Sequence, residues 1–421
     1  AMHDGGVGHC DACHTMHNSL EGAVMTNAAS PATQFNGNQY LLIGTDASST
    51  CLSCHGNGGT TSYHMYTPGA SAGGTVPATY TPGGDFAWLD MDFAWTAWGQ
   101  PHTSAGERHG HNVIAVDFGL GVDTTHAAAP GGTYLSTSLS CISCHDPHGK
   151  TRRLSTGGFD DNTTLGVASE PIETYGSYGA DPTTTAGTAV GIFRLLGGTG
   201  YRPLSLAAIE AVFTDQAPVA VVPSGYNRVE TATMTRTVYG YGMSEWCANC
   251  HPQIHDGAAN NIHPSGQNAD ALLTLVDNAG NTIAANYNAY IASGNLTGVQ
   301  ASSYNSLIPY EEGIGNTPAT YTADLADMVT RAVNDDSNLA GPSTGNEVVM
   351  CLSCHRAHAS GWDSALRWNY SSEMLVDATG AYVAGEGRTA AEISASYMEK
   401  DFGATMGPLQ RSLCNKCHVK D

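Results

Sequence analysis

Twelve cysteines and six of the histidines carry the chemistry that this sequence suggests. The cysteines form six pairs with two residues between partners, and a histidine follows each pair directly. The six motifs are Cys10, Cys13 and His14; Cys51, Cys54 and His55; Cys141, Cys144 and His145; Cys247, Cys250 and His251; Cys351, Cys354 and His355; and Cys414, Cys417 and His418. In C-x-x-C-H, both thiols add to vinyl groups at one porphyrin edge and the adjacent imidazole binds the iron. The pattern predicts six haem c groups, twelve thioether cysteines and six proximal ligands.

Two other interpretations of paired cysteines fit less well. Tetrathiolate zinc sites and the disulfide frameworks of secreted chains also use such pairs. Neither requires a histidine directly after every pair, and here all six pairs have one.

Six further ligands are needed if both faces of every iron are bound. Methionine could serve and would raise the reduction potential, but the twelve remaining histidines favour imidazole on both faces. The first, third and fifth motifs extend to C-x-x-C-H-x-x-H and end in His17, His148 and His358. With a tether of roughly 10 Å, each of these histidines would have to round the macrocycle edge to reach its own iron. Binding to a different haem packed close by is much easier and is therefore expected.

The even-numbered haems are expected to take their distal ligands from histidines upstream of each odd motif. These are His3, His111 and His263, with His64 and His255 as alternatives. The remaining histidines fit no repeat, and we expect them at the surface: His9, His102, His109 and His126.

The sequence predicts one multihaem domain over 1–421, because no long linker divides the chain. It divides into three two-haem modules at about 1–105, 106–258 and 259–421. With 50 glycines and few apolar periodic runs, the sequence predicts mainly coil, short α-helices and very little β structure wrapped around a linear haem column.

Four short helices are expected. Thr389 and Glu392 form a capping box before a helix over 390–401, with Gly403 as its stop. Thr322 is expected to cap a second helix, which carries Leu325 and Met328 on one face. Two more are expected over 205–214 and 284–292. Glycine-rich turns follow Pro82, Pro130 and Leu196.

The net charge of −22 makes nucleic acid and anionic membranes poor partners. No apolar run is long enough for a transmembrane helix, so membrane insertion is not expected. The first six residues lack the basic and apolar stretches of an export signal, and we expect a leader to have been removed. Covalent haem attachment takes place outside the bacterial inner membrane, which predicts a periplasmic or extracellular location.

Several segments resemble the outer-surface hexahaem c-type cytochromes of metal-reducing bacteria, which polymerise into conductive filaments. They are Gly5–Val7, Cys13–Asn18, Met243–Trp246, Cys144–Lys150, Cys354–Gly361 and Cys414–Asp421.

The resemblance implies an extracellular homopolymer whose haems form one continuous chain, with parallel and perpendicular contacts alternating. It implies that His17 binds the fifth haem of the neighbouring subunit. If each extended motif reaches one module back, His148 then serves the first haem and His358 the third. The residues alone do not fix this direction, and they leave open a monomer with every ligand internal.

The leading functional hypothesis is a non-enzymatic electron conduit from redox partners in the cell envelope to external acceptors such as metal oxides. A soluble periplasmic carrier with the same haems is the second hypothesis. A multihaem reductase is the third, and it would need one iron with an open face.

Overall fold

The computed structural model describes about half of the chain. The main described segments are 10–15, 41–56, 64–148, 195–203, 212–218, 242–255, 280–290 and 347–412. Shorter pieces lie at 19–20, 23–24, 152–153, 159–160, 188–189, 220–222, 238–240, 265–266, 276 and 309–312.

Several predicted site residues lie outside the described residues, and their assignments stay predictions. They are all three members of the sixth motif, namely Cys414, Cys417 and His418, together with His3, His9, His17 and His263. The helix expected after Thr322 also lies outside the described residues.

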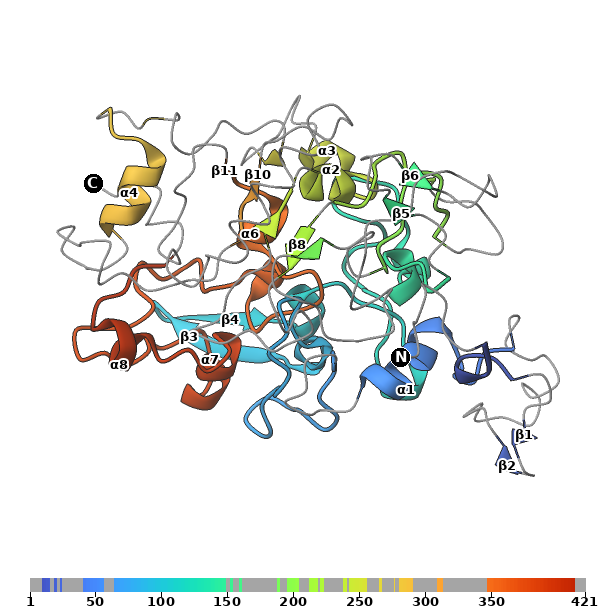
Figure 1. The fold of residues 1–421 in the computed structure, drawn as a ribbon. Coiled ribbons are helices and arrows are strands. Elements are labelled where there is room, and N and C mark those ends of the chain that lie inside the picture. Colours follow the sequence, from blue (N-terminus) through green and yellow to red (C-terminus); the bar gives the residue numbers. More distant parts are fainter. Residues whose placement is uncertain are drawn as a thin grey trace.

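Short helices are scattered through irregular chain (Figure 1). The α-helices are α1 (Ala47–His55), α2 (Met243–Ala248), α3 (Pro252–His255), α4 (Ile283–Tyr290), α6 (Cys351–Cys354), α7 (Ala390–Ser396) and α8 (Phe402–Met406). The 3₁₀ turns are η2 (Cys10–Ala12), η3 (Phe86–Asp90), η4 (Gly106–His109), η5 (Val116–Phe118), η6 (Ser136–Ser138), η7 (Cys141–Ser143) and η12 (Asp363–Ala365). This mostly irregular chain with short helices confirms the predicted fold class.

The described strands are short. They are β1 (Ser19–Leu20), β2 (Ala23–Val24), β3 (Phe93–Ala97), β4 (Gln100–Ser104), β5 (Arg152–Arg153), β6 (Phe159–Asp160), β7 (Thr188–Ala189), β8 (Ala220–Val222), β9 (Val238–Tyr239), β10 (Glu311–Glu312) and β11 (Glu347–Val348). One sheet has the order β11-β10-β9-β8-β7 and joins distant parts of the chain through strands of two or three residues.

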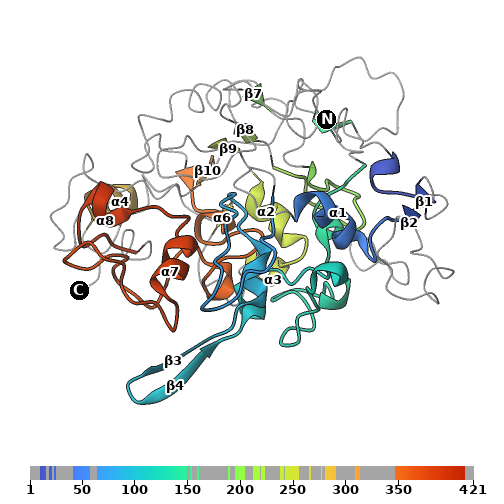
Figure 2. The same ribbon diagram turned by 90° about the horizontal axis from the view of Figure 1, so that it is seen from below.

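The longest strands form the β3–β4 hairpin. Antiparallel pairing runs from Phe93 opposite Ser104 to Ala97 opposite Gln100. Trp98 and Gly99 turn the chain with φ of 49° and 73°, which fits the two-residue turns favoured by strand twist. The hairpin projects from the body of the molecule, and Trp98 at its tip is 95% exposed (Figure 2).

The helix at 390–401 is shorter than the sequence predicts. Thr389 and Glu392 do form the capping box, with the Thr389 side chain accepting from the Glu392 N–H. However, α7 ends at Ser396, because Met398 and Glu399 adopt left-handed backbone with φ near 55°. Asp401 then caps a separate helix, α8, so Gly403 lies inside a helix and is not a stop.

The other helix predictions have mixed outcomes. α4, Ile283–Tyr290, confirms the helix expected near 284–292 as far as that segment is described. Residues 212–214 of the helix expected over 205–214 are not helical. None of the described helices is long and apolar enough to cross a membrane.

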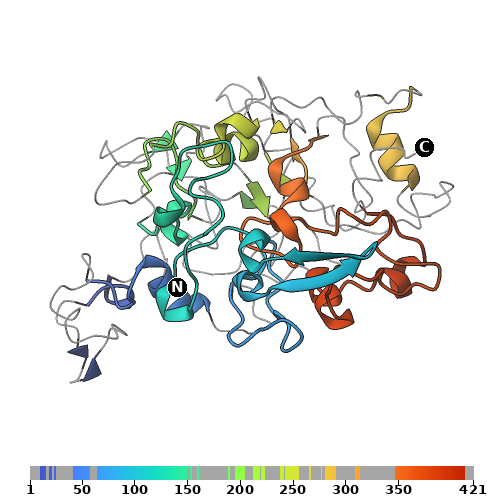
Figure 3. The same cartoon turned by 180° about the vertical axis from the view of Figure 1, so that it is seen from behind.

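Apolar packing is divided among several small clusters. One joins Trp362, Tyr397 and Phe402 with other residues of the C-terminal segment. Another joins Trp88 and Phe93 to Ala395, and the reverse view shows the hairpin beside the α7 segment (Figure 3). For the part of the chain that the structure describes, such divided packing agrees with a fold that needs another source of burial.

His109 is buried, so the prediction that it lies at the surface is wrong. Its Nδ1 lies 2.9 Å from the Trp88 carbonyl oxygen. Its Nε2 lies 2.8 Å from Ser104 Oγ and 3.3 Å from Arg388 Nη2, in a cluster that also contains Asp363. Burial lowers the pKa of His109 to about 4, and the imidazole is therefore neutral at pH 7.

Replacing Thr389 by Ala is expected to destabilise the protein by about 1 kcal/mol, because the first turn of α7 loses its side-chain cap. Urea unfolding followed by far-ultraviolet circular dichroism measures the change. The matched control is Thr389→Ser, which keeps the hydroxyl. Equal midpoints for the two variants would contradict the capping role.

His109 is expected to make the protein less stable in acid. Its folded pKa of about 4 lies below the ordinary value of about 6.5, so the unfolded chain takes up the proton first. Stability is therefore full above pH 6.5 and declines as the pH falls towards 4, by on the order of 3 kcal/mol for this group.

Unfolding of His109→Gln from pH 4 to 7 should show a shallower pH dependence than wild type. His126→Gln is the control, since exposed His126 pairs with Asp123 at 3.2 Å in a solvated loop. Identical pH profiles for wild type and His109→Gln would contradict a buried neutral His109.

Candidate haem-binding sites

Each of the five described C-x-x-C-H motifs begins in a helical turn. The histidine N–H donates to the carbonyl oxygen of the first cysteine, one turn back, in four of them: His14 to Cys10 at 2.8 Å, and His145 to Cys141, His251 to Cys247 and His355 to Cys351 at 3.0 Å each. In the remaining motif the whole sequence from Cys51 to His55 lies in α1. One turn brings the first cysteine and the histidine onto the same side of the backbone, as a thioether and an axial ligand require.

The cysteines of successive motifs are neighbours. A hydrogen bond with Cys141 raises the pKa of the Cys51 thiol, and one with Cys351 does the same for Cys247. Burial raises the pKa of Cys13 and Cys144, and the neighbouring thiols Cys54 and Cys250 add to these increases. The first five motifs thus follow one another in space in chain order.

Two serines repeat the same contact between motifs. Ser48 Oγ accepts from the Cys141 N–H at 3.0 Å, and Ser244 Oγ accepts from the Cys351 N–H at 3.3 Å. Each serine stands three residues before the first cysteine of an even motif. The third motif has the same S-x-x-C-x-x-C-H pattern, with Ser138 three residues before Cys141, so the pattern alone would not have revealed this link.

Three pairs of imidazole rings face each other across a gap of similar size. Ring centroids are 6.5 Å apart for His14 and His148, which are nearly parallel at 11°. They are 6.4 Å apart for His145 and His358 and 6.1 Å apart for His111 and His251.

This spacing fits one metal ion between each pair. With metal–nitrogen bonds of about 2 Å, an ion held by two imidazoles puts their centroids roughly 6 Å apart. Each pair joins a proximal histidine to one of the predicted distal histidines. The described residues therefore fit haem iron at three positions.

Backbone carbonyl oxygens orient two imidazoles of these pairs and that of the fifth motif. Nδ1 of His111 lies 2.7 Å from the Ala357 oxygen, Nδ1 of His251 lies 2.8 Å from Pro130, and Nδ1 of His355 lies 2.7 Å from Ser364. A proton on Nδ1 leaves Nε2 as the lone-pair nitrogen that a metal needs.

Burial keeps two of these rings neutral. It lowers the pKa of His251 to about 4, with His111 contributing, and it also lowers the pKa of His355. Neutral imidazole is the ligating form, because protonation of Nε2 would remove its lone pair.

The glycine-rich turns position two of the paired histidines. Gly83 accepts the His358 N–H at 2.8 Å, and His358 accepts the His111 N–H at 2.9 Å. A Cβ at Gly84, where φ is 90°, would lie 1.7 Å from the Ala359 oxygen. One at Gly110 would lie 2.2 Å from the His358 oxygen. The segment around His358 is therefore held between two loops that approach it through glycine backbone.

A second glycine turn supports the fourth motif. A Cβ at Gly132 would lie 1.9 Å from the Cys250 oxygen, and the same turn supplies the Pro130 carbonyl to His251. The sequence identified these segments only as turns. Which backbone carbonyl lies beside which imidazole ring depends on tertiary contacts, and no local sequence pattern indicates these contacts.

The other candidate histidines occupy different surroundings. Burial lowers the pKa of His64, and nearby His55 lowers it further. His255 is buried with its Nε2 3.2 Å from Glu245 Oε1. His102 is half-buried and stacks on Trp95 with ring centroids 5.4 Å apart, whereas His126 is exposed as expected.

Comparison with known proteins agrees with the motif pattern. No protein-family model matches the chain. The C-type cytochrome OmcS of Geobacter sulfurreducens is 47% identical over 440 residues, which cover 100% of this chain and 94% of that protein.

Two solved structures resemble this one over the full length of both chains. They are the OmcS nanowires of Geobacter sulfurreducens, determined by cryo-electron microscopy, and the Outer Membrane Cytochrome S filament of the same organism. Each is 44% identical, with TM-scores of 0.78 and 0.79 respectively. The chain belongs to the OmcS family of c-type cytochromes.

Proposed function

We propose that this chain is an electron-transfer cytochrome with six haem c groups, each iron bound by two imidazoles, that polymerises into an extracellular filament. The three imidazole pairs at one-metal spacing are the observation that carries the proposal. Bound haem iron supplies reversible one-electron oxidation and reduction.

The ligand assignment extends these pairs to all six haems. His148, His358 and His111 serve the first, third and fourth haems as distal ligands. His3, His263 and His17 are assigned to the second, the sixth and a neighbour's fifth haem, and His64 remains an alternative to His3 because it lies near His55. The proximal ligands are His14, His55, His145, His251, His355 and His418.

The thioether assignment covers all twelve cysteines. For the first five haems it rests on motifs whose helical turns the structure describes, from Cys10 to Cys354. For the sixth haem, Cys414 and Cys417 are assigned from the C-x-x-C-H sequence alone, because both lie outside the described residues.

Adjacent cysteines support a continuous haem path. Because thioether bonds form at the porphyrin edge, neighbouring thiols such as Cys51 and Cys141, or Cys247 and Cys351, place the edges of successive macrocycles close together. Electrons then need no mobile carrier between haems. The protein's own part is to fix this order and to keep both faces of each iron filled.

Self-assembly is proposed from the family. The solved relatives are named as filaments and match this chain along its whole length. A ligand from one subunit to the next makes a head-to-tail contact that does not close on itself, which yields an open filament. The filament would carry electrons from redox partners in the cell envelope to external acceptors such as metal oxides, with no catalytic site of its own.

Replacing Gly84 by Ala should expose one face of the third haem iron. The added Cβ would collide with the Ala359 oxygen and displace His358. We expect a high-spin signal from about one haem in six in the resting ferric spectrum. Gly69→Ala is the matched control, because Gly69 also has positive φ, at 75°, but no atom within 4 Å of a new Cβ. Equal low-spin spectra for both variants would contradict the role of His358.

Substitution of His17 by Ala distinguishes a filament from a soluble carrier. If His17 bridges subunits, the variant should load six haems, show one high-spin iron and assemble at least about tenfold less into filaments by electron microscopy, since a coordinate bond to each neighbour is lost. Filaments that still form with every iron low-spin would refute the bridge. A high-spin iron in the wild-type protein would instead favour a multihaem reductase.

A further inference from the structure

The β3–β4 hairpin is an arm that is fixed at its base and exposed at its turn. Phe93, the first residue of β3, is buried and packs in an apolar cluster with Trp88. Ser104, the last residue of β4, is buried and donates to the Asp363 carboxylate. Trp98 in the turn is 95% exposed, more than any other large apolar side chain that the structure describes. The arm therefore presents a large apolar ring to solvent.

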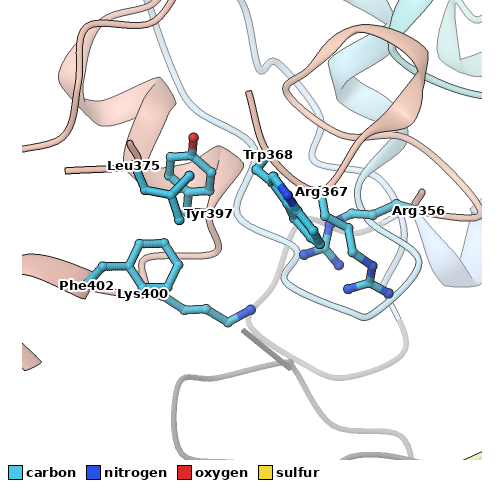
Figure 4. Close-up of a pocket in the computed structure, with 7 residues that line it drawn as sticks. All are labelled: Arg356, Arg367, Trp368, Leu375, Tyr397, Lys400 and Phe402. Carbon is cyan, nitrogen blue, oxygen red and sulfur yellow. The ribbon is translucent and has the colours of Figure 1, made fainter. Parts of the chain in front are cut away.

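The base of the arm rests on a well-packed part of the molecule. The guanidinium carbon of Arg388 lies 4.2 Å from the ring centroid of Phe93 and 4.7 Å from that of Trp362. Trp362 is buried and belongs to an apolar cluster of the C-terminal segment. Three further members of this cluster lie close together in Figure 4: Leu375, Tyr397 and Phe402. The arm is thus anchored to the C-terminal part of the molecule, which fixes its direction.

Three aromatic rings form one surface on the outer half of the hairpin. Trp95 and His102 are a cross-strand pair whose rings stack, with centroids 5.4 Å apart and planes 18° apart. Trp98 meets the His102 ring edge to face, with centroids 6.5 Å apart. These contacts hold the Trp98 ring before any partner binds, so little side-chain entropy is left to lose on docking. Tryptophan is also enriched among the residues that dominate binding energy.

The hairpin differs from the whole chain in charge. Residues 93–104 contain no Asp, Glu, Lys or Arg, whereas the chain has a net charge of −22. Exposed edge strands are usually protected from association by charged side chains, and this hairpin has none. A cationic partner would be attracted to the acidic surface elsewhere. An acidic partner such as a second copy is repelled by that surface and needs an uncharged contact.

The form of this contact follows from one residue of β4. Pro101 has no backbone N–H to donate, which disfavours the addition of another strand along this edge. Contact through the aromatic rings is therefore favoured over β-strand addition.

The arm adjoins the site assigned to the fifth haem. The Ser364 carbonyl oxygen lies 2.7 Å from Nδ1 of His355, the proximal ligand of that haem. The preceding residue, Asp363, accepts from Ser104 at the end of β4. The hairpin base and the His355 ring thus contact adjacent residues of one segment. On the proposed function, His17 of the next subunit reaches this haem, so that subunit comes close to the arm.

The direction of the arm fits the same arrangement. In Figures 1 and 3 the turn between β3 and β4 lies towards the end of the molecule that carries α7 and α8, whereas α1 lies towards the opposite end. Figure 2 shows the same separation from below. In a head-to-tail filament, the end of one subunit that carries α1 and the first motif faces the α7–α8 end of its neighbour.

We propose that the β3–β4 hairpin docks on the neighbouring copy of this chain in the filament. Trp98 packs against the amino-terminal end of the subunit that supplies His17 to the fifth haem, and Trp95 and His102 support the Trp98 ring. The inference rests on the proposed function and adds a second contact to the coordinate bond between subunits. Such a contact fixes the rotation of one subunit relative to the next, which a single coordinate bond leaves open.

Filament assembly by haem-loaded Trp98→Asn tests the inference. Asn followed by Gly is the preferred pair for a two-residue turn with positive φ at both positions, so the variant keeps the hairpin and removes the ring. The protein concentration at half-assembly, measured by sedimentation, should rise about thirtyfold, as for loss of a hot-spot tryptophan. Thr103→Ala changes an exposed residue on the other face of the same hairpin and should assemble like wild type. Equal half-assembly concentrations for the two variants overturn the inference.

A cryo-electron microscopy map of wild-type filaments is decisive without any variant. Trp98 buried against the next subunit of the same filament supports the inference. Trp98 in solvent, where another partner could bind it, or against a subunit of a second filament, overturns the inference and leaves the proposed function intact. A wild-type protein that loads six haems and forms no filaments refutes the proposed assembly and this inference with it.

Discussion

The constraint on which the rest of this structure depends is the spacing between two imidazole rings, which leaves room for one metal ion between them. His14 with His148, His145 with His358, and His111 with His251 each join residues far apart in the chain. Among the described residues the apolar clusters are small and separate. Each imidazole pair, with the macrocycle that it would hold, would there take the place of the single large core of other domains. The surrounding loops can then be short, irregular and rich in glycine.

The ligand chemistry could be predicted from sequence because it is local. A histidine directly after C-x-x-C, or three residues later, can be recognised without knowledge of the fold. The sequence singles out His148 and His358 in this way, and the structure places their rings opposite those of His14 and His145. The direction in which these histidines reach is a different matter. It depends on which segments lie side by side in the fold. The sequence alone therefore did not exclude a monomer in which every ligand is internal.

Burial and backbone contacts were harder to predict for the same reason. His109 resembled a surface residue because it fits no repeat, yet the hairpin, Trp88 and Arg388 enclose it. Nor could the sequence show that the turns after Pro82 and Pro130 supply carbonyls and close approaches to the paired histidines. The break after Ser396 arises from left-handed backbone at Met398 and Glu399, whose residue types do not signal it.

Electrostatics bears on both ligand binding and assembly. The chain is strongly acidic, and burial lowers the pKa of two of the histidines of the attachment motifs, His251 and His355. Copies of a chain with a net charge of −22 repel one another at low salt. On the proposed function, an imidazole–iron bond between subunits offsets this repulsion, which explains why assembly would use a ligand and not a charged surface.

The most direct test is a structure of the native, haem-loaded protein with the irons located. We expect one iron midway between His14 and His148, one between His145 and His358 and one between His111 and His251, each within a covalently attached haem. An iron at any of these positions bound on its second face by a different residue, or by water, would contradict the central claim.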